Sequence, residues 1–258
     1  MPSIAWIAVS PVKGLRLQTR DEVQLTEDGV PGDRAFFLVD EAGAMVNGKR
    51  LGSLMTVEAE HEPGSGALAL LFPDRDPLSG AVELGAPESV RFYGLTLHAR
   101  PVLGPFSAAL SEHCRARVRL FAAPADRTGV DRGRDGAVTL LSTGSLERLG
   151  AEALARAPID PRRFRMTFGV EGVPAHAEDT WIDRSVRVGD AVLEVKGNVG
   201  RCAVTTRNAD SGVVDFRTLH HLSSYRRDVA STEPLPFGVH ARVVSPGGVR
   251  VGDAVALG

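Results

Sequence analysis

Cys202 is the residue whose type and setting suggest the most chemistry in this sequence. It ends the glycine-rich segment Gly197–Cys202, and Arg201 stands directly before it. A thiol in a turn beside a guanidinium group can have a lowered pKa and act as a thiolate nucleophile or metal ligand. A free cysteine is also one of the residue types most often buried as a small apolar side chain. The local sequence leaves both interpretations of Cys202 open.

The remaining cysteine and the absent motifs exclude several kinds of site. The chain has 2 cysteines, and Cys114, which ends an apolar segment, is predicted to lie in the core. Two cysteines cannot form a disulfide framework, a four-cysteine zinc site or an all-cysteine iron–sulfur cluster. The sequence also lacks the Gly-Lys-Ser/Thr of a P-loop, a Gly-x-Ser-x-Gly elbow and a dinucleotide-binding Gly-x-Gly-x-x-Gly between a strand and a helix.

A second group of residues has the chemistry to bind an anion. The predicted strand Val138–Leu141 runs into Ser142 and Thr143, after which a helix is predicted. Backbone N–H groups at the start of a helix attract anions, although an ordinary helix cap explains the same residues. Basic side chains stand near other predicted strand ends, and together they would line a pocket that binds an anion: Lys13, Arg34, Arg50 and Arg165. Asp179 is a candidate acid or base, with a solvated turn as the alternative.

Charge and length exclude further classes of function. The 258 residues include 30 Lys and Arg against 32 Asp and Glu, a net charge of −2, which argues against a general nucleic-acid-binding surface. No apolar run is long enough for a membrane-spanning helix. The first residues lack the basic and apolar regions of a signal peptide, so we expect a cytoplasmic protein with reduced thiols and no membrane partner.

Strands are the main elements that must position these residues. Short apolar or alternating segments separated by Gly, Pro, Asp and Asn predict strands at residues 4–9, 35–39, 56–61, 67–72, 95–99, 117–122, 138–141, 164–170, 186–188, 191–196, 203–206, 239–245 and 254–257. Helices are predicted at residues 106–114, 142–156 and 219–226, and a loop over a surface or cleft at residues 123–136. The heptapeptide at residues 186–192 recurs at 249–255, and we interpret the two copies as equivalent corners of one closed barrel.

These segments, in this order, resemble the MOSC family (molybdenum-cofactor sulfurase C-terminal domain) preceded by its N-terminal β-barrel domain. The resemblance covers nearly the whole chain and is carried by residues 10–14, 32–40, 49–51, 138–146, 163–165, 177–181, 188–190, 200–206, 237–239 and 251–253. It implies a β-rich α+β fold, with a small N-terminal β-barrel (residues 1–104) packed on a C-terminal MOSC β-barrel (residues 105–258) that carries a few helices.

The resemblance also implies a function. It is to molybdenum-dependent amidoxime-reducing proteins, in which a cysteine at the position of Cys202 ligates molybdenum. A thiolate is a soft ligand that suits a metal already bound by dithiolene sulfurs. By this resemblance, Asp179 relays a proton, and the phosphate of the molybdenum cofactor (molybdopterin) contacts Lys13, Arg34, Arg50, Ser142, Thr143 and Arg165. The implied reaction removes oxygen from an N-hydroxylated small molecule. No flavin, haem or iron–sulfur motif is apparent, so a separate reductase must supply electrons.

Departures from the family pattern keep alternatives open. Gly14 stands where relatives often have Ser, Thr167 where they often have Asn, and Arg207–Gly212 where they typically read Asp-Pro-Asp-Thr-Gly. The alternative function is a non-redox carrier of sulfur or of the molybdenum cofactor that uses Cys202 as a persulfide site. A cofactor-free descendant is a third possibility. Pyridoxal phosphate is disfavoured, because the chain has only three lysines, at positions 13, 49 and 196.

Overall fold

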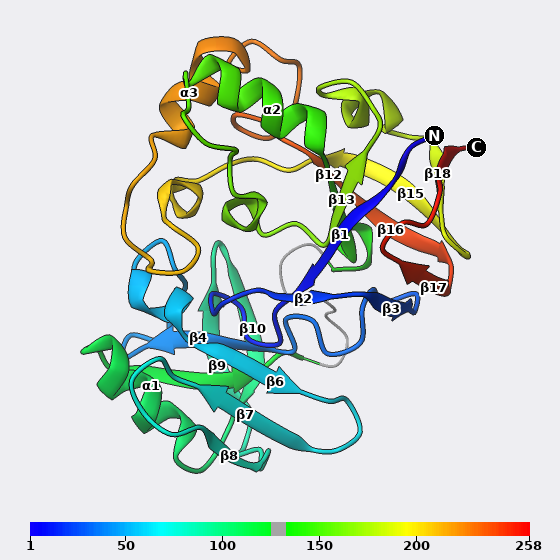
Figure 1. Ribbon diagram of the computed structural model, residues 1–258. Coiled ribbons are helices and arrows are strands. Elements are labelled where there is room, and N and C mark those ends of the chain that lie inside the picture. The colour runs from blue at the N-terminus through cyan, green and yellow to red at the C-terminus, as the bar shows by residue number, and fades with distance from the viewer. Residues whose placement is uncertain (125–132) are drawn as a thin grey trace.

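The computed structural model describes residues 1–124 and 133–258. It is the β-rich α+β structure that the sequence predicts, with a smaller β structure below a larger one in Figure 1. The three α-helices of the described ranges are α1 (Phe106–Cys114), α2 (Thr143–Glu152) and α3 (Thr218–Tyr225). None of the helices in these ranges combines the length and the apolar character needed to cross a membrane.

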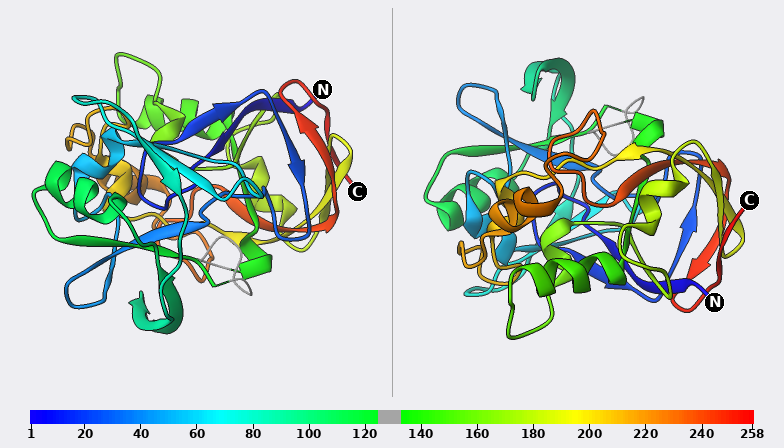
Figure 2. Two further views of the ribbon diagram at one scale, coloured as in Figure 1. Left: turned by 90° about the horizontal axis from the view of Figure 1, so that it is seen from below. Right: turned by 90° about the horizontal axis from the view of Figure 1, so that it is seen from above.

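The larger sheet has the strand order β18-β14-β15-β16-β12-β13-β1-β2. It pairs β12 with β13 in parallel and its other neighbours antiparallel. An isolated bridge from Ser3 to Ala254 joins the beginning of β1 to the residues before β18, so the two termini lie side by side (Figures 1 and 2). Its strands are β1 (Ser3–Val9), β2 (Gln18–Arg20), β12 (Val138–Ser142), β13 (Phe168–Glu171), β14 (Ser185–Val188), β15 (Ala191–Asn198), β16 (Val239–Ser245) and β18 (Val255–Leu257).

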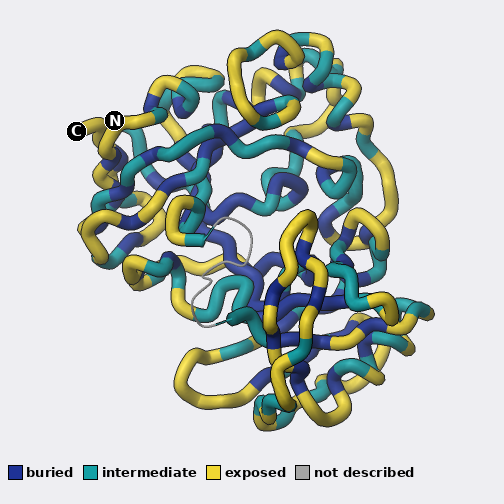
Figure 3. Tube along the Cα trace, turned by 180° about the vertical axis from the view of Figure 1, so that it is seen from behind, coloured by how far each residue is buried: buried dark blue, intermediate teal, exposed yellow. Residues whose placement is uncertain are grey.

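The smaller structure contains a five-stranded sheet, β5-β4-β11-β10-β9, and a three-stranded sheet, β6-β7-β8. Its apolar core is sealed by α1, whose Phe106 and Leu110 are fully buried. Figure 3 shows the buried strands at the centre of each half. The strands are β4 (Phe36–Asp40), β5 (Met45–Val46), β6 (Glu58–His61), β7 (Ala67–Leu71), β8 (Leu78–Ala81), β9 (Glu88–Phe92), β10 (Leu95–Pro101) and β11 (Val118–Ala122).

The two halves exchange elements across residue 104, where the sequence places a domain boundary. The first strand, β1, pairs with β13 of the larger sheet. In the opposite direction, α1 and β11 follow residue 104 but pack in the smaller half, where β11 pairs with β4. A separate pair, β3 (Glu22–Leu25) with β17 (Gly247–Arg250), also joins residues from both ends of the chain. The smaller half is therefore formed by one continuous stretch of chain, from β4 to β11, and the strands before and after that stretch belong to the larger half.

Most sequence-predicted elements are present, and one is wrong. Residues 203–206, predicted as a strand, form a short 3₁₀ helix, η5 (Ala203–Thr206). The Thr205 N–H and hydroxyl both bond the Cys202 carbonyl, and the Thr206 hydroxyl bonds the Ala203 carbonyl. These local bonds override the strand preference of β-branched residues. Further 3₁₀ turns lie at Gly52–Thr56 (η1), Gly133–Gly136 (η2), Pro161–Phe164 (η3) and Ala177–Trp181 (η4).

The structure agrees only in part with the predicted loop at residues 123–136 and the predicted helix at residues 142–156. The predicted loop at residues 123–136 contains residues 125–132, which lie outside the described ranges, and ends in η2. The second predicted helix ends at Glu152 rather than near residue 156. In the repeated heptapeptide, Gly189 and Gly252 both have positive φ, at 57° and 90°, and the two copies contact each other through the Gly189 N–H and the Ala254 carbonyl.

The pairing of β1 with β13 yields a stability prediction. A Cβ at Gly169 would overlap the indole of Trp6, whereas a Cβ at Gly150 in α2 would meet only Ile159 Cγ1, at 3.6 Å. We expect Gly169→Ala to lower the free energy of unfolding by about 1–3 kcal/mol through overpacking. Gly150→Ala should raise it by about 0.5–1 kcal/mol, because alanine is the better helix former. Urea unfolding of both variants measures this, and equal effects would contradict the packing.

Candidate functional site

An open cleft of about 480 Å³ lies between the two halves of the molecule. Ligand pockets are commonly roughly 300–1,000 Å³ and often occur between domains, so this cleft can hold a cofactor-sized molecule. Both halves line it, with residues from the N-terminal third, from the ends of β12 and β15, and from the segments before β13 and β16. The lining residues on which the site depends are Lys13, Arg34, Arg165, Thr139, Thr167 and Cys202.

Cys202 lines this cleft and is exposed. It lies directly before η5, in extended backbone conformation, and its carbonyl accepts the first bonds of that turn. Cys114, by contrast, is partly buried against the core of the smaller half, and burial raises the pKa of its thiol. The structure therefore rules out the buried interpretation of Cys202, and it packs Cys114 against the core with partial burial.

Arg201 anchors the turn that carries Cys202. Its side chain is buried, with 7% of the residue exposed, and it contacts the rings of Phe164 and Phe237. Its Nε donates to the Phe237 carbonyl at 2.8 Å and its Nη1 to the Phe164 carbonyl at 2.9 Å. A buried guanidinium needs such acceptors, because an unsatisfied buried charge is costly. Arg201 therefore fixes the position of the residue that follows it.

Two predicted basic residues meet in the cleft, where both depart from ordinary backbone conformation. Arg34 and Arg165 have φ values of 52° and 56°, in the left-handed region that costs energy for residues with a side chain. Arg34 Nη2 donates to the Arg165 carbonyl at 2.9 Å, and Arg165 Nη2 donates to the Leu15 carbonyl at 2.7 Å. Asp33 forms an ion pair with Arg34 and also accepts the Ser10 N–H. Strained residues held by their surroundings cluster at functional sites.

Lys13 brings a third cation to the same cleft. Its ammonium nitrogen lies 5.9 Å from the centre of the Phe92 ring and 5.8 Å from that of Tyr93. Ammonium groups at this distance from an aromatic face are attracted to it. Lys13 comes from the N-terminal third, and Arg165 from the segment before β13. The positive charge of the cleft thus depends on the contact between the two halves.

Thr139 and Thr167, which the sequence analysis did not select as site residues, form a hydroxyl pair in the cleft. Thr167 N–H donates to Thr139 Oγ1 at 2.8 Å, Thr139 N–H donates to Thr167 Oγ1 at 3.3 Å, and the two hydroxyl oxygens are 3.2 Å apart. One hydroxyl proton serves the bond between them, so the pair has a second proton to donate. Thr139 is the one polar residue in the apolar segment Val138–Leu141, and this was the only sequence signal for it.

Four predicted site residues do not line this cleft. Arg50 is exposed and pairs with Asp40 at 2.7 Å. Ser142 is fully buried, and its hydroxyl accepts the Ser145 N–H as the N-cap of α2. Thr143 begins the same helix. The strand–helix junction is therefore an ordinary cap, the alternative that the sequence had left open.

Asp179, the fourth, belongs to a polar network behind the cleft. Its carboxylate accepts bonds from Arg226 Nη2 at 2.6 Å and from Asn198 Nδ2 at 2.8 Å. Asn198 ends β15 and so leads into the Cys202 turn. The neighbouring Glu178 is fully buried and accepts the Ser142 N–H and the Ser145 hydroxyl. Asp179 is thus linked to the Cys202 turn through its hydrogen bond with Asn198.

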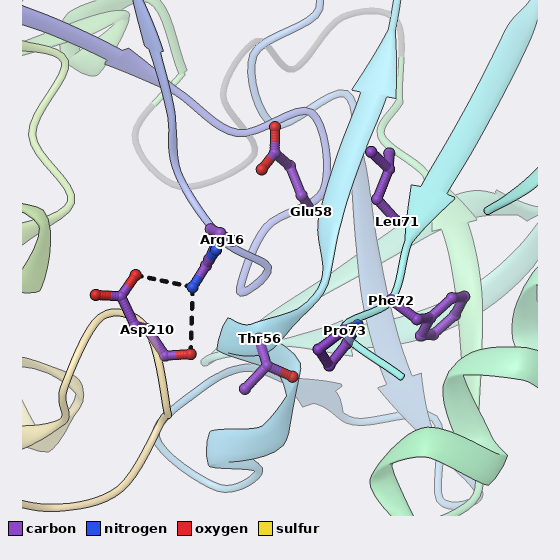
Figure 4. A pocket seen from close by; sticks show the side chains of 7 residues that line it. All are labelled: Arg16, Thr56, Glu58, Leu71, Phe72, Pro73 and Asp210. Carbon is purple, nitrogen blue, oxygen red and sulfur yellow. Dashed lines mark hydrogen bonds and ion pairs between the residues drawn. The ribbon is translucent and has the colours of Figure 1, made fainter. Parts of the chain in front are cut away.

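A second, smaller pocket of about 260 Å³ lies elsewhere along the junction of the halves (Figure 4). Arg16 crosses it to reach Asp210, with Nη2 2.8 Å from Oδ1. Arg162 donates to both oxygens of Asp210, and this holds the pKa of the carboxyl below its usual range. Asp210 belongs to the segment 207–212 that departs from the family pattern, so this departure contributes contacts between the halves.

Comparison with protein families identifies the chain. Residues 126–256 match the MOSC domain, and residues 1–120 match the MOSC N-terminal beta barrel domain. The chain belongs to the MOSC family. Together the two matches span nearly all of its residues, which confirms the resemblance and the fold class that the sequence motifs imply.

The chain is similar to proteins that are named as amidoxime-reducing components. The chain is 35% identical over 125 residues to "Mitochondrial amidoxime-reducing component 1" of Xenopus laevis, covering 46% of this chain and 35% of that protein. It is 25% identical to "Mitochondrial amidoxime reducing component 2" of Bos taurus, covering 98% of this chain and 82% of the relative. Among solved structures, the YUAD protein from Bacillus subtilis aligns with a TM-score of 0.46 and 12% identity, over 99% of this chain and 94% of that one.

The network behind the cleft yields a prediction of pH dependence. Burial, aided by the positive charges of Arg226 and Arg148 and opposed by Asp179, lowers the pKa of His176 to about 4. The unfolded chain then binds a proton at higher pH than the folded chain does, so stability is full above pH ~6.5 and falls as the pH approaches 4. His176→Asn, which tolerates the positive φ of 61°, should flatten this loss, by on the order of 1 kcal/mol after allowing for partial exposure. Urea unfolding at several pH values measures the slope. An unchanged slope would contradict the assignment.

Proposed function

We propose that this chain is a molybdenum-cofactor-dependent reductase that removes oxygen from N-hydroxylated small molecules. The observation that carries the proposal is the meeting of an exposed thiol, Cys202, with basic side chains from both halves in one cleft. The names of the amidoxime-reducing relatives support the same reaction.

The donor set fits a metal-bearing pterin phosphate. Cys202 offers a soft ligand at one part of the cleft, and a thiolate suits a metal that other sulfurs already bind. Lys13, Arg34 and Arg165 supply charge for a phosphate, and the Thr139–Thr167 pair supplies a hydroxyl proton. When bound, the cofactor would supply two-electron redox chemistry at molybdenum, and the chain would supply position and electrostatics.

Some residues would supply charge for the cofactor, and others hold the Cys202 turn in place. Arg201 bonds two main-chain carbonyls and so holds the backbone of the turn that presents Cys202 to the cleft. Asn198 and Asp179 support the same turn from behind. We propose that Asp179 acts on the cleft through Asn198 as a positioning residue. Arg50, Ser142 and Thr143 lie outside the cleft lining and have no part in the proposed mechanism.

The electron donor and the location belong to the proposal as well. The sequence carries no recognisable flavin, haem or iron–sulfur motif, so a separate reductase would transfer electrons to the cleft. We propose small molecules as substrates, because the cleft volume suits them and the net charge of −2 disfavours nucleic acid. A cytoplasmic location stays a prediction, and the relatives are named as mitochondrial.

A carrier of sulfur or of the cofactor is the second candidate, because an exposed thiol in a cationic cleft would also hold a persulfide. Metal analysis separates the reductase from a sulfur carrier, and turnover of an amidoxime separates it from a carrier of the cofactor. Protein purified from a host that makes the cofactor should contain about one molybdenum per chain if Cys202 is a ligand. A persulfide on Cys202 without molybdenum would favour the carrier instead.

The two cysteines provide a matched pair of variants for this test. Cys202→Ser should abolish the reduction of an amidoxime by the reduced protein and lower the molybdenum content severalfold, because the hydroxyl is a harder and weaker ligand. Cys114→Ser, outside the cleft, should retain both the metal and the activity. Metal analysis and thermal melting of each variant give the result. Full molybdenum content in folded Cys202→Ser would refute the ligand role.

The hydroxyl pair is tested by a second set of variants. Thr167→Val removes one hydroxyl at nearly constant shape, whereas Thr167→Ser keeps it. We expect the valine variant to release the pterin roughly ten-fold faster, since a hydrogen bond to a charged group is worth about 1.5–3 kcal/mol. Release is followed by pterin fluorescence after gel filtration, with thermal melting as the control for folding. Equal release from the two variants would exclude the Thr167 hydroxyl as a donor to the pterin.

A further inference from the structure

A hairpin of the smaller half reaches the cleft with an aromatic residue at its tip. Strands β9 and β10 are joined by Tyr93 and Gly94, and the hairpin rises from the smaller half toward the larger one (Figures 1 and 3). Tyr93 lines the cleft together with Cys202. It is 64% exposed, which is unusual for a large aromatic side chain. Its contact with Lys13 is the one role that the cleft described so far gives it.

The backbone at Tyr93 is strained in a way that the sequence could have avoided. Tyr93 has φ 53°, in the left-handed region, whereas the adjacent Gly94 does not take a positive φ. A bulky residue with positive φ is a true outlier, and glycine would take that conformation without cost. Strain of this kind persists where the surroundings enforce it, and it concentrates at ligand-binding sites. In this cleft Arg34 and Arg165 share the same feature.

Three contacts orient the Tyr93 ring. The Phe92 ring meets it edge to face, with the ring centres 5.2 Å apart. The Lys13 ammonium lies 5.8 Å from its centre, and Asn47 Nδ2 donates to its hydroxyl oxygen at 3.3 Å. A ring oriented by three neighbours presents a flat apolar surface, which loses little conformational freedom when a ligand packs on it.

The position of Tyr93 along the depth of the cleft indicates what it contacts. Thr167 and Phe164, which line the same cleft, are 1% and 3% exposed, so they form its floor. Tyr93 stands at the mouth. A cofactor whose phosphate contacts Arg165 and Thr167 would occupy the floor and extend to Lys13 beside the Tyr93 ring, and the substrate would enter past the mouth.

We propose that Tyr93 is a specificity-determining residue, whose ring forms an aromatic wall for the group attached to the reacting nitrogen centre. The proposal rests on the proposed function and names its substrate class, namely N-hydroxylated compounds that carry a planar aryl group. Aromatic rings stack offset or edge to face on such a wall, whereas small aliphatic substrates of the same reactivity gain little from it.

Two amidoximes with the same reacting group form the test. Benzamidoxime carries a phenyl ring where acetamidoxime carries a methyl group. The variants are Tyr93→Asn, which tolerates positive φ but has no ring, and Tyr93→Phe, which keeps the ring. Leu95→Ala, an exposed change on the same hairpin outside the cleft lining, is the control. Steady-state kinetics give kcat and KM for both substrates, and calorimetry gives the dissociation constant of benzamidoxime.

We expect Tyr93→Asn to raise KM for benzamidoxime about five-fold more than KM for acetamidoxime, the size of an aromatic pair interaction. Its kcat values should change alike for both substrates, and Tyr93→Phe should resemble the parent protein. An equal change in both KM values, or loss of pterin from Tyr93→Asn, would overturn the proposal, since Tyr93 would then support the cofactor. If the parent protein reduces neither compound, the proposed function fails. Calorimetry still tests Tyr93 in that case, and unchanged benzamidoxime binding by Tyr93→Asn would overturn its role.

Discussion

The burial of the Arg201 guanidinium is the interaction on which the cleft depends. It bonds the carbonyls of Phe164 and Phe237, which belong to segments on either side of the thiol turn. Phe164 directly precedes Arg165, so one side chain fixes both the thiol and a basic residue of the cleft. Gly238 makes the packing possible, since a Cβ there would come within 2.8 Å of the Leu140 carbonyl and 3.3 Å of Arg201 Nη2.

Contacts between the two halves keep the walls of the cleft in place. The strands β1 and β2 belong to the larger sheet, yet Val12 and Leu15 between them are buried in the core of the smaller half, and the Lys13 N–H donates to the Phe36 carbonyl. Arg16 and Asp210 add an ion pair across the junction, and Arg207 Nη2 donates to the Lys49 carbonyl. Partly exposed ion pairs contribute little singly, and the buried contacts therefore carry most of this coupling.

Charge converges where chemistry is proposed, and three of the eight described non-glycine residues with positive φ lie there. The chain as a whole carries a net charge of −2, yet Lys13, Arg34 and Arg165 converge on one cleft. Arg34, Arg165 and Tyr93 also hold left-handed backbone conformations there. An anionic cofactor would be attracted by these three cations, and its contacts would offset the strain of the left-handed backbone conformations.

Local pattern determined the family, the β-rich class and most strands, because alternation and turn residues act within a few neighbours along the chain. The motifs also selected Cys202, Lys13, Arg34 and Arg165, which the structure brings together. Tertiary structure decided the rest. The short helix after Cys202 and the capping role of Ser142 depend on particular hydrogen bonds. The Thr139–Thr167 pair and the place of Tyr93 depend on which strands become neighbours, and residues distant in sequence meet only when the two halves close on each other.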